Sequence, residues 1–247
     1  MRRTVFRWVA IGLLLTGGLT SLSASDLWDR AVEYYAAYGD LVPGRLTIRF
    51  DQYNGRGKLV SSEISELAVS VGPEGEIQSE VVFASKDGKD VTEERRENPA
   101  SGSPFGGGND DADENDSDSP FAGLQRSPFD PDEQDHITVV DTGRRESING
   151  IPTRVHDFEQ RTGESARTIG RAWIAEQDGT PVKLIANIAP LPGFIDSFEM
   201  IQKYATDGLG RWFMSSMEFI GEGNILFIRR RFESEFLFSD YFPLPAD

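Results

Sequence analysis

Few side chains in this sequence are spaced for catalysis or for metal binding. The two histidines, His136 and His156, are far apart and form no His-x-His or His-Glu-x-x-His pattern, so zinc or iron hydrolase chemistry has little support. No Gly-x-Ser-x-Gly nucleophile elbow occurs. Because there is no cysteine, thiolate metal sites and disulfides are excluded. We therefore predict a protein that is not an enzyme, with no catalytic residue, no bound metal and no cofactor.

One acidic run has some of the spacing of a calcium loop. Residues 111–116 place oxygen ligands at alternate positions. The run lacks the glycine that calcium loops carry at the sixth position, and Ala122 stands where the bidentate glutamate would be at the twelfth. We interpret it as a solvated acidic loop.

The side chains suited to ligand binding are mostly apolar and lie mainly in the last third of the chain. Methionine and phenylalanine adapt to irregular apolar ligands such as acyl chains. A sheet curled beneath a helix is also wide enough to leave a cavity. A packed core needs the same residue types, so the sequence is compatible with a packed core and with a ligand cavity. The candidate ligand-binding residues are Trp28, Tyr35, Phe198, Met200, Met214, Met217, Phe219, Arg230 and Phe236.

Arg230 is the charged member of this set. Alternation along its strand puts it on the face of Phe232 and sends Arg229 and Arg231 to the other face. An arginine on an apolar face needs a partner, because burial of an unpaired charge is costly. That partner is either a buried carboxylate or the anionic head of a ligand.

A β-hairpin at residues 167–190 is the clearest element that could position these side chains. Both arms alternate with a period of two, which is typical of strands with one buried face. Asp178 and Gly179 lie between the arms, where glycine accepts a positive φ without steric cost. Pro181 begins the second arm, where its missing N–H does little harm.

The rest of the chain predicts one helix and more strands. Apolar residues in Asp26–Tyr38 recur at helical spacing, and this amphipathic helix should cover a sheet or close an apolar cavity. From Arg45 the period changes to two, and short turns join the strands into an antiparallel meander. Expected strands include 45–51, 59–71, 77–85, 137–140 and 148–158, followed by the hairpin and three long strands after Pro192.

Two groups of apolar side chains should each share one face of a strand. The first is Ile77, Val81 and Phe83, and the second is Phe213, Met217 and Phe219. Together the pattern predicts a mainly β (α+β) fold. It should be a single curved antiparallel sheet of about ten strands that forms an incomplete β-barrel, with the N-terminal amphipathic helix covering it.

An acidic insertion at about residues 97–135 interrupts this domain, which spans residues 25–247. The insertion is rich in Gly, Ser, Asp and Pro and has almost no aliphatic residues, so we expect most of it to be disordered. It repeats the tripeptide Ser-Pro-Phe at 103–105, 119–121 and 127–129. We expect Phe129 to pack, because structure resumes next to it. The other two copies are either compositional drift or short segments that dock on the domain or a partner.

The first 24 residues have the pattern of a signal peptide. Arg2, Arg3 and Arg7 form a basic region, Val9–Leu15 is apolar, and Leu22-Ser23-Ala24 is a plausible cleavage site. The apolar run is shorter than the roughly 20 residues that span a bilayer. We therefore expect a periplasmic or secreted protein with no membrane span in the mature chain.

The charge pattern limits the partners. The formal net charge is −16, and no basic stripe is present. Nucleic acid and anionic membrane surfaces are unsuitable partners for such a chain. We expect a monomer that binds a lipid or an acylated protein, with the acidic loop as a second candidate contact for a protein partner.

Several segments together resemble the periplasmic lipoprotein carrier superfamily, which is LolA/LolB-like and includes RseB-type sensor domains. The resemblance implies an incomplete β-barrel closed by helices around an apolar cavity that takes up acyl chains. The acidic insertion is outside the family pattern, and the resemblance assigns no functional residue here. The segments that carry it are Leu27–Tyr38 leading into a strand near Arg45, Gly170–Ile174, Gly179–Leu184, and the final meander through Phe198, Trp212, Phe232 and Phe238–Tyr241.

The function expected from these features is a periplasmic carrier of a hydrophobic ligand, a lipid or the acyl chain of a lipoprotein, in the sorting of envelope lipoproteins. The alternative is a non-enzymatic envelope sensor or scaffold of the same fold. In that alternative the cavity is filled by side chains and the acidic loop binds a protein partner.

Overall fold

The structure is a computed structural model that describes residues 24–73, 75–98, 126–191, 193–225 and 228–244. The predicted signal peptide lies almost wholly outside the described residues. So do the candidate calcium loop, the first two Ser-Pro-Phe tripeptides and most of the acidic insertion.

The described chain is mainly β, as the sequence predicted. Its helices are α1 (Ala24–Tyr38), the short α2 (Thr92–Glu97) and the 3₁₀ helix η3 (Pro131–His136). Its strands are β1 (Leu41–Val42), β2 (Arg45–Asn54), β3 (Leu59–Val71), β4 (Ile77–Lys86), β5 (Lys89–Asp90), β6 (Ile137–Ile148), β7 (Ile151–Arg161), β8 (Arg167–Ala175), β9 (Pro181–Ala189), β10 (Ile195–Thr206), β11 (Trp212–Ile225), β12 (Ile228–Ser239) and β13 (Phe242–Pro243).

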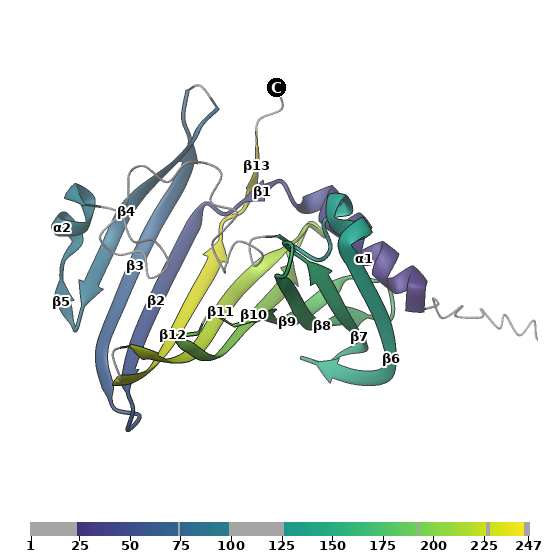
Figure 1. The fold of residues 1–247 in the computed structure, drawn as a ribbon. Helices are drawn as coiled ribbons and strands as arrows, with labels where there is room; N and C mark the ends of the chain where they lie inside the picture. The colour runs from purple at the N-terminus through teal and green to yellow at the C-terminus, as the bar shows by residue number, and fades with distance from the viewer. Residues whose placement is uncertain (1–23, 74, 99–125, 192, 226–227, 245–247) are drawn as a thin grey trace, which may run out of the picture.

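Eleven of these strands form one antiparallel sheet that is not closed into a barrel, which confirms the predicted incomplete barrel. Its order is β5-β4-β3-β2-β12-β11-β10-β9-β8-β7-β6, so β12 from the end of the chain pairs with β2 from its beginning. β1 and β13 form a separate two-stranded pair beside the end of α1 (Figure 1). The sheet curves strongly, with β2 to β5 on one side and β6 to β9 on the other (Figure 1).

One predicted strand, residues 148–158, is wrong at its start. Asn149 (φ 51°) and Gly150 (φ 84°) form the turn between β6 and β7 instead of lying inside a strand. Two successive left-handed residues match the twist of a tight hairpin, and Asn-Gly adopts them readily. β6 therefore runs on to Ile148, well beyond the predicted end at Val140.

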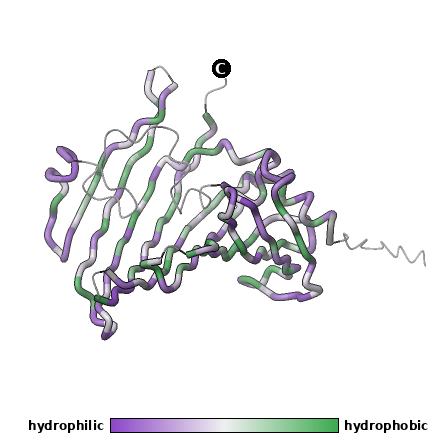
Figure 2. The backbone as a smooth tube through the Cα atoms, viewed as in Figure 1, coloured by the Kyte–Doolittle hydropathy of each residue, from purple (hydrophilic) through white to green (hydrophobic). Residues whose placement is uncertain are grey.

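The inner face of the sheet is the one that carries Leu184, Phe198 and Phe219 and packs against α1, and the opposite face is the outer face. Leu27, Trp28 and Ala31 of α1 are buried against the inner face, so the helix covers one end of the sheet. Apolar and polar residues alternate along many of the strands in Figure 2, as a sheet with one buried face requires.

A bulge in β4 places Phe83 on the face opposite to the predicted one. In the register with β3, Leu67 pairs with Val81 and Glu66 pairs with Phe83, which leaves Val82 as an extra residue. Because cross-strand partners project to the same side, Val81 and Phe83 lie on opposite faces. The prediction that they share a face with Ile77 is therefore wrong for Phe83, which is partly exposed on the outer face.

The end of the predicted insertion is ordered. Phe129 is fully buried in the core, and its ring centroid lies 5.1 Å from that of Trp28. Gln134 of η3 accepts a 3.0 Å hydrogen bond from the indole nitrogen of Trp28 and donates bonds of 3.0 and 2.7 Å to the carbonyl oxygens of Pro128 and Asp130. These contacts hold residues 128–134 between α1 and the sheet.

Candidate functional site

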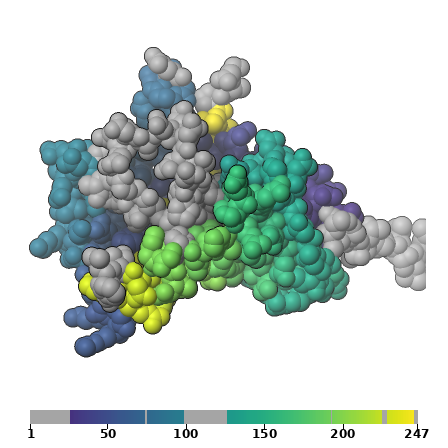
Figure 3. All heavy atoms as spheres, viewed as in Figure 1, coloured from purple at the N-terminus to yellow at the C-terminus, as the bar shows by residue number. Residues whose placement is uncertain are grey.

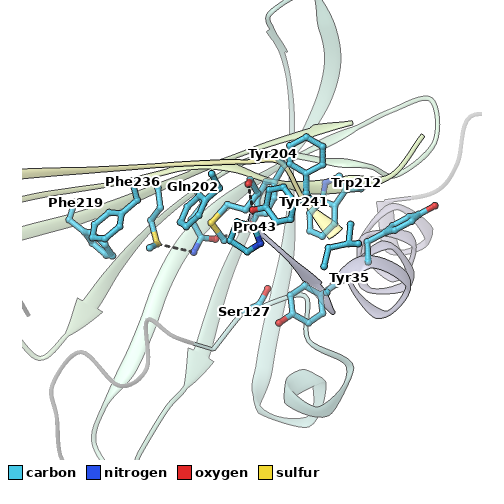
Figure 4. Close-up of a pocket in the computed structure, with 16 residues that line it drawn as sticks. Tyr35, Pro43, Ser127, Gln202, Tyr204, Trp212, Phe219, Phe236 and Tyr241 are labelled. Carbon is cyan, nitrogen blue, oxygen red and sulfur yellow. Dashed lines mark hydrogen bonds between the residues drawn. The ribbon is translucent and has the colours of Figure 1, made fainter. Parts of the chain in front are cut away.

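An apolar cavity of about 460 Å³ opens on the inner face where the end of α1 meets β10, β11 and β12 (Figure 4). Its lining is aromatic, aliphatic and thioether in character, with few polar groups. The lining residues are Tyr35, Tyr38, Gly39, Leu41, Pro43, Ser127, Gln202, Tyr204, Trp212, Phe213, Met214, Met217, Phe219, Phe236, Phe238 and Tyr241.

The register of three strands brings the cavity wall together. Gln202 of β10 pairs with Met217 of β11, and Met217 pairs with Phe236 of β12. One step along, Tyr204 pairs with Met214. Since cross-strand partners share a face, these side chains form one continuous apolar surface on the inner face.

A bulge in β11 decides which residue faces the cavity next to Tyr204. The pairing moves from Lys203–Ser216 to Tyr204–Met214, so Ser215 is the extra residue. The prediction that Phe213 shares a face with Met217 is therefore wrong, because strict alternation does not survive a bulge. Phe213 still borders the cavity, where its ring centroid lies 4.7 Å from that of Tyr241.

The opposite wall comes from the two ends of the fold. α1 ends at Tyr38, and the Gly39 amide donates a 2.6 Å hydrogen bond to the Tyr35 carbonyl. The chain then enters β1, whose pairing with β13 lies beside Pro43 and Tyr241. Residues from the start and the end of the chain thus close the cavity together, as Figure 4 shows.

The polar groups in the wall are mostly satisfied by other protein groups. The Tyr204 hydroxyl donates a 2.6 Å bond to Gln202 Oε1, and the Tyr241 hydroxyl donates a 2.5 Å bond to the Met214 carbonyl. The Trp212 indole donates a 3.0 Å bond to the Pro181 carbonyl. These donors are already used within the protein, so the surface offered to a ligand is largely apolar.

Burial also favours the neutral form of three phenols of the wall, those of Tyr35, Tyr204 and Tyr241. It raises the pKa of Tyr204 and of Tyr241 well above their ordinary value. Burial likewise raises the pKa of Tyr35, with smaller contributions from the nearby carboxylates of Asp130 and Asp40. No charged residue is among the described side chains that line the cavity, which suits an uncharged apolar group.

The candidate residues divide into three groups. Tyr35, Met214, Met217, Phe219 and Phe236 line the cavity. Trp28, Phe198 and Met200 are buried in the core at 5, 3 and 2% exposure and do not border the cavity. Arg230 is also absent from the lining, because it stands near the other end of β12, where it pairs with Asn54 and Gly223.

Several lining residues were not among the candidates. The rings of Tyr204 and Trp212 stack with a centroid distance of 4.7 Å. The side-chain nitrogen of Gln202 lies 3.6 Å from the sulfur of Met200 and 3.8 Å from the sulfur of Met217. Tyr204 shares a strand face with Phe198 in the sequence pattern, which could have identified it. Ser127 and Tyr241 come from loops that only the folded chain brings here, so no local signal points to them.

A second hollow, of about 310 Å³, lies on the outer face and is strongly polar. It includes Asp51, Glu218 and Glu233, whose charges meet Arg49 at 2.9 Å, Lys203 and Arg231 respectively. It is a surface of paired charges. Across the described residues, no group of three or more histidine or acidic side chains is arranged to hold a metal ion.

The comparisons with known proteins give structural neighbours only. No protein-family model and no curated protein matches the sequence. In the described part of the chain, none of the helices has the length and apolar character needed to cross a bilayer.

Solved structures with a similar course of the chain include the following three. A domain from Vibrio parahaemolyticus named for outer membrane lipoprotein sorting has 12% identity and a TM-score of 0.44, with 91% of this chain and 95% of that chain covered. A LolA superfamily protein from Nitrosomonas europaea has 12% identity and a TM-score of 0.38, covering 92% and 96%. The Pseudomonas aeruginosa MucA/MucB complex contributes a chain with 12% identity and a TM-score of 0.24, covering 90% and 99%.

Proposed function

We propose that this protein binds the acyl chain of a lipid or lipoprotein in its inner-face cavity and carries it within the cell envelope. The observation that carries the proposal is the cavity itself. It measures about 460 Å³, within the range of about 300–1,000 Å³ that is usual for small-molecule sites. Its wall combines aromatic rings with two methionines, Met214 and Met217, whose flexible side chains adapt to an irregular apolar ligand.

The chemistry of the wall favours an apolar ligand over a polar one. The described lining includes no charged side chain, and the hydroxyls of Tyr204 and Tyr241 already have protein partners. An acyl chain needs no hydrogen bonds and gains from leaving water. Arg230 lies away from this wall, so the proposed site includes no arginine for a ligand head group.

The envelope location is part of the proposal and depends on the N-terminal sequence. The basic residues Arg2, Arg3 and Arg7 and the apolar run that follows them support export and cleavage. An exported protein with an apolar cavity is well placed to shield an acyl chain between two membranes.

Native mass spectrometry of the mature protein, purified from a bacterial periplasm without detergent, tests the proposal. We expect a reproducible added mass that organic extraction assigns to lipid. The variant Met217→Trp should remove it, because a larger apolar side chain fills the cavity without making it polar. Ile169→Trp, a matched change at a partly exposed position on the outer face of β8, should keep it.

The outcomes separate the two functions considered for this fold. Retention of the lipid mass in Met217→Trp, or equal loss in Ile169→Trp, contradicts binding in this cavity. A bare polypeptide mass, together with no uptake of a fluorescent fatty acid, contradicts the carrier function. The sensor or scaffold alternative, in which a protein partner is bound, would then be the one to pursue.

A further inference from the structure

The outer-face hollow, of about 310 Å³, is built from three neighbouring strands of the sheet. Its lining residues all belong to β2, β12 and β11, which lie side by side in that order. In Figure 3 the yellow surface of β12 is seen between the blue surface of β2 and β3 and the green surface of β10 and β11, in the order of the sheet. Hydrogen-bonded strands, and not loops, therefore fix the positions of its side chains.

The register places two pairs of like charges next to each other in this hollow. Asp51 of β2 stands directly opposite Glu233 of β12. Glu235 of β12 stands directly opposite Glu218 of β11. Directly opposed side chains in an antiparallel sheet have Cβ atoms about 5 Å apart, and like charges at such positions are destabilising. These two acidic pairs thus bring four carboxylates together at a cost in stability.

The cations of the protein compensate the two acidic pairs incompletely. Among the described side chains that line the hollow, Arg49 is the only cation, and it bonds Asp51 Oδ2 at 2.9 Å. Arg231 and Lys203 reach two of the glutamates from outside the lining. Three cations against four carboxylates leave one negative charge in excess. All three cations are about half exposed, and ion pairs of that kind contribute little to stability.

The Asp51 carboxylate at the floor of the hollow lacks one hydrogen-bond partner. Its residue is only 5% exposed, and among the described residues its Oδ1 atom has no partner. Arg49 bonds the other oxygen, Oδ2. A buried carboxylate oxygen without a donor is costly, because its hydration is lost and nothing replaces it. A positively charged donor bound in the hollow would satisfy this oxygen and relieve the repulsion between Asp51 and Glu233.

The spacing of the two acidic pairs suits a ligand with two positive centres. Glu233 and Glu235 are two residues apart on β12, which separates the pairs by about 7 Å along the strand. Between and beside the carboxylates, Ile220 and the ring of Tyr53 add apolar surface to the lining. A linear aliphatic diamine has this character, because a short apolar chain joins its two ammonium groups.

We propose that the outer-face hollow binds a linear aliphatic diamine, alone or as part of a longer polyamine, with one ammonium group on each acidic pair. A metal ion fits less well, since no group of three or more acidic side chains among the described residues is arranged to hold one. The hollow lies on the face opposite the apolar cavity. The diamine site therefore goes beyond the proposed acyl-chain binding, and each can fail without the other.

Arg49 is the internal competitor of this ligand. Its guanidinium bonds Asp51 in one acidic pair and stands in register opposite Glu235 of the other. Because its side chain is about half exposed, it can turn toward solvent when the diamine enters. Removal of this cation should therefore strengthen diamine binding, an effect that a purely structural ion pair does not produce.

Isothermal titration of putrescine into the full mature chain at low ionic strength tests the proposal. We expect saturable binding, and n-butylamine, with a single ammonium group, should bind clearly more weakly. Asp51→Asn should weaken putrescine binding about tenfold or more, because it removes the buried charge that the ammonium group meets. Arg49→Gln should strengthen it about threefold. Equal affinity for putrescine and n-butylamine overturns the assignment of a diamine.

Glu159→Gln is the matched control, since it removes one carboxylate from an exposed pair with Arg167 on the outer face of β7. It changes the net charge by the same amount as Asp51→Asn and should leave putrescine binding unchanged. Equal weakening in both variants shows diffuse attraction to an acidic chain and overturns the proposal. So does the absence of putrescine binding in both the wild type and Arg49→Gln.

Glu235→Gln keeps the test decisive if Asp51→Asn loses its fold, because Glu235 is only half-buried. Putrescine should raise the midpoint of thermal unfolding of the wild type and of Glu159→Gln, since a ligand that binds the folded state stabilises it. The rise should be clearly smaller in Glu235→Gln. An equal rise in Glu235→Gln and the wild type overturns the placement of the second ammonium group.

Other occupants give different results. A peptide with the sequence Lys-x-Lys that binds where putrescine does not shows a site for side chains of a partner protein, and it overturns the diamine proposal. Calcium that binds more tightly than putrescine and depends on Asp51 shows a metal site and also overturns it. Putrescine binding without fatty-acid binding supports the diamine site and contradicts the proposed function. Fatty-acid binding without putrescine binding does the reverse.

Discussion

The Tyr204 hydroxyl donates a 2.6 Å hydrogen bond to the side-chain carbonyl of Gln202, two residues earlier on β10. Both side chains line the cavity, and Gln202 is only 5% exposed. The Gln202 amide group faces the sulfur atoms of Met200 and Met217, which are weak acceptors. The pair therefore satisfies its strongest hydrogen-bonding groups within itself and leaves an apolar wall.

Tyr204→Phe should lower the free energy of unfolding by about 1–3 kcal/mol, because it leaves the buried carbonyl of Gln202 without its partner. Gln202→Leu should cost a similar amount by orphaning the tyrosine hydroxyl. The double variant should cost clearly less than the sum, since removal of both partners leaves an apolar pair. Urea unfolding of the four proteins measures this coupling, and strictly additive losses would contradict it.

Stability at alkaline pH should depend on the same tyrosine. Burial raises the pKa of Tyr204 and of Tyr241 in the folded state, while the unfolded phenols ionise near pH 10. A raised folded pKa means that the folded protein holds its protons longer. The free energy of unfolding is therefore unaffected below about pH 10 and falls as the pH rises further. Tyr204→Phe should reduce this slope by up to about 1.4 kcal/mol per pH unit, as measured by unfolding between pH 8 and 11.5. An identical slope in both proteins would contradict the burial argument.

Local periodicity predicted most of the strands but not all of the faces. β2, β3, β4, β8 and β9 begin where alternation begins in the sequence, because a half-buried strand repeats every two residues. The bulges at Val82 and Ser215 change the phase within a strand, and nothing in the alternation marks them. This is why Phe83 and Phe213 were assigned to the wrong faces.

The sequence predicted only those residues of the candidate site that can be recognised from the pattern within a single strand. Met214, Met217 and Phe236 were identified from composition, since flexible apolar residues on late strands suit either a core or a cavity. The division between the two depends on which residues α1 and Phe129 cover, and that is a tertiary outcome. Phe198 and Met200 lie in the core, whereas Ser127 and Tyr241 reach the cavity from distant loops.

The packing of Phe129 should be a major source of stability. Phe129→Ala should lower the free energy of unfolding by about 3–5 kcal/mol, because the ring is fully buried against Trp28 and its loss leaves a cavity. Gln134→Ala should cost about 1–3 kcal/mol, because the Trp28 indole loses its 3.0 Å acceptor. Arg126→Ala is the control, since its 3.3 Å ion pair with Glu133 is exposed on the arginine side and should contribute under about 1 kcal/mol. Chemical denaturation gives all three values, and a cost for Phe129→Ala as small as that of the control would contradict this packing.

Stability at acidic pH should depend on an ion pair between Asp141 of β6 and Arg154 of β7. Arg154 donates bonds of 2.7 and 2.6 Å to the two oxygens of Asp141, and this pairing lowers the carboxyl pKa to about 2. The unfolded carboxyl titrates near 3.9, so the contribution is present above about pH 4 and is lost as the pH falls toward 2. Both side chains are partly exposed, which limits the effect to about 1 kcal/mol.

Asp141→Asn should therefore be less stable than the wild type at pH 6 and nearly equal to it at pH 2. Glu159→Gln, which breaks an exposed pair with Arg167, should show a smaller difference at pH 6. Thermal unfolding of these proteins between pH 6 and pH 2 measures the difference in stability. If Asp141→Asn is still less stable than the wild type at pH 2, the loss comes from packing and not from charge.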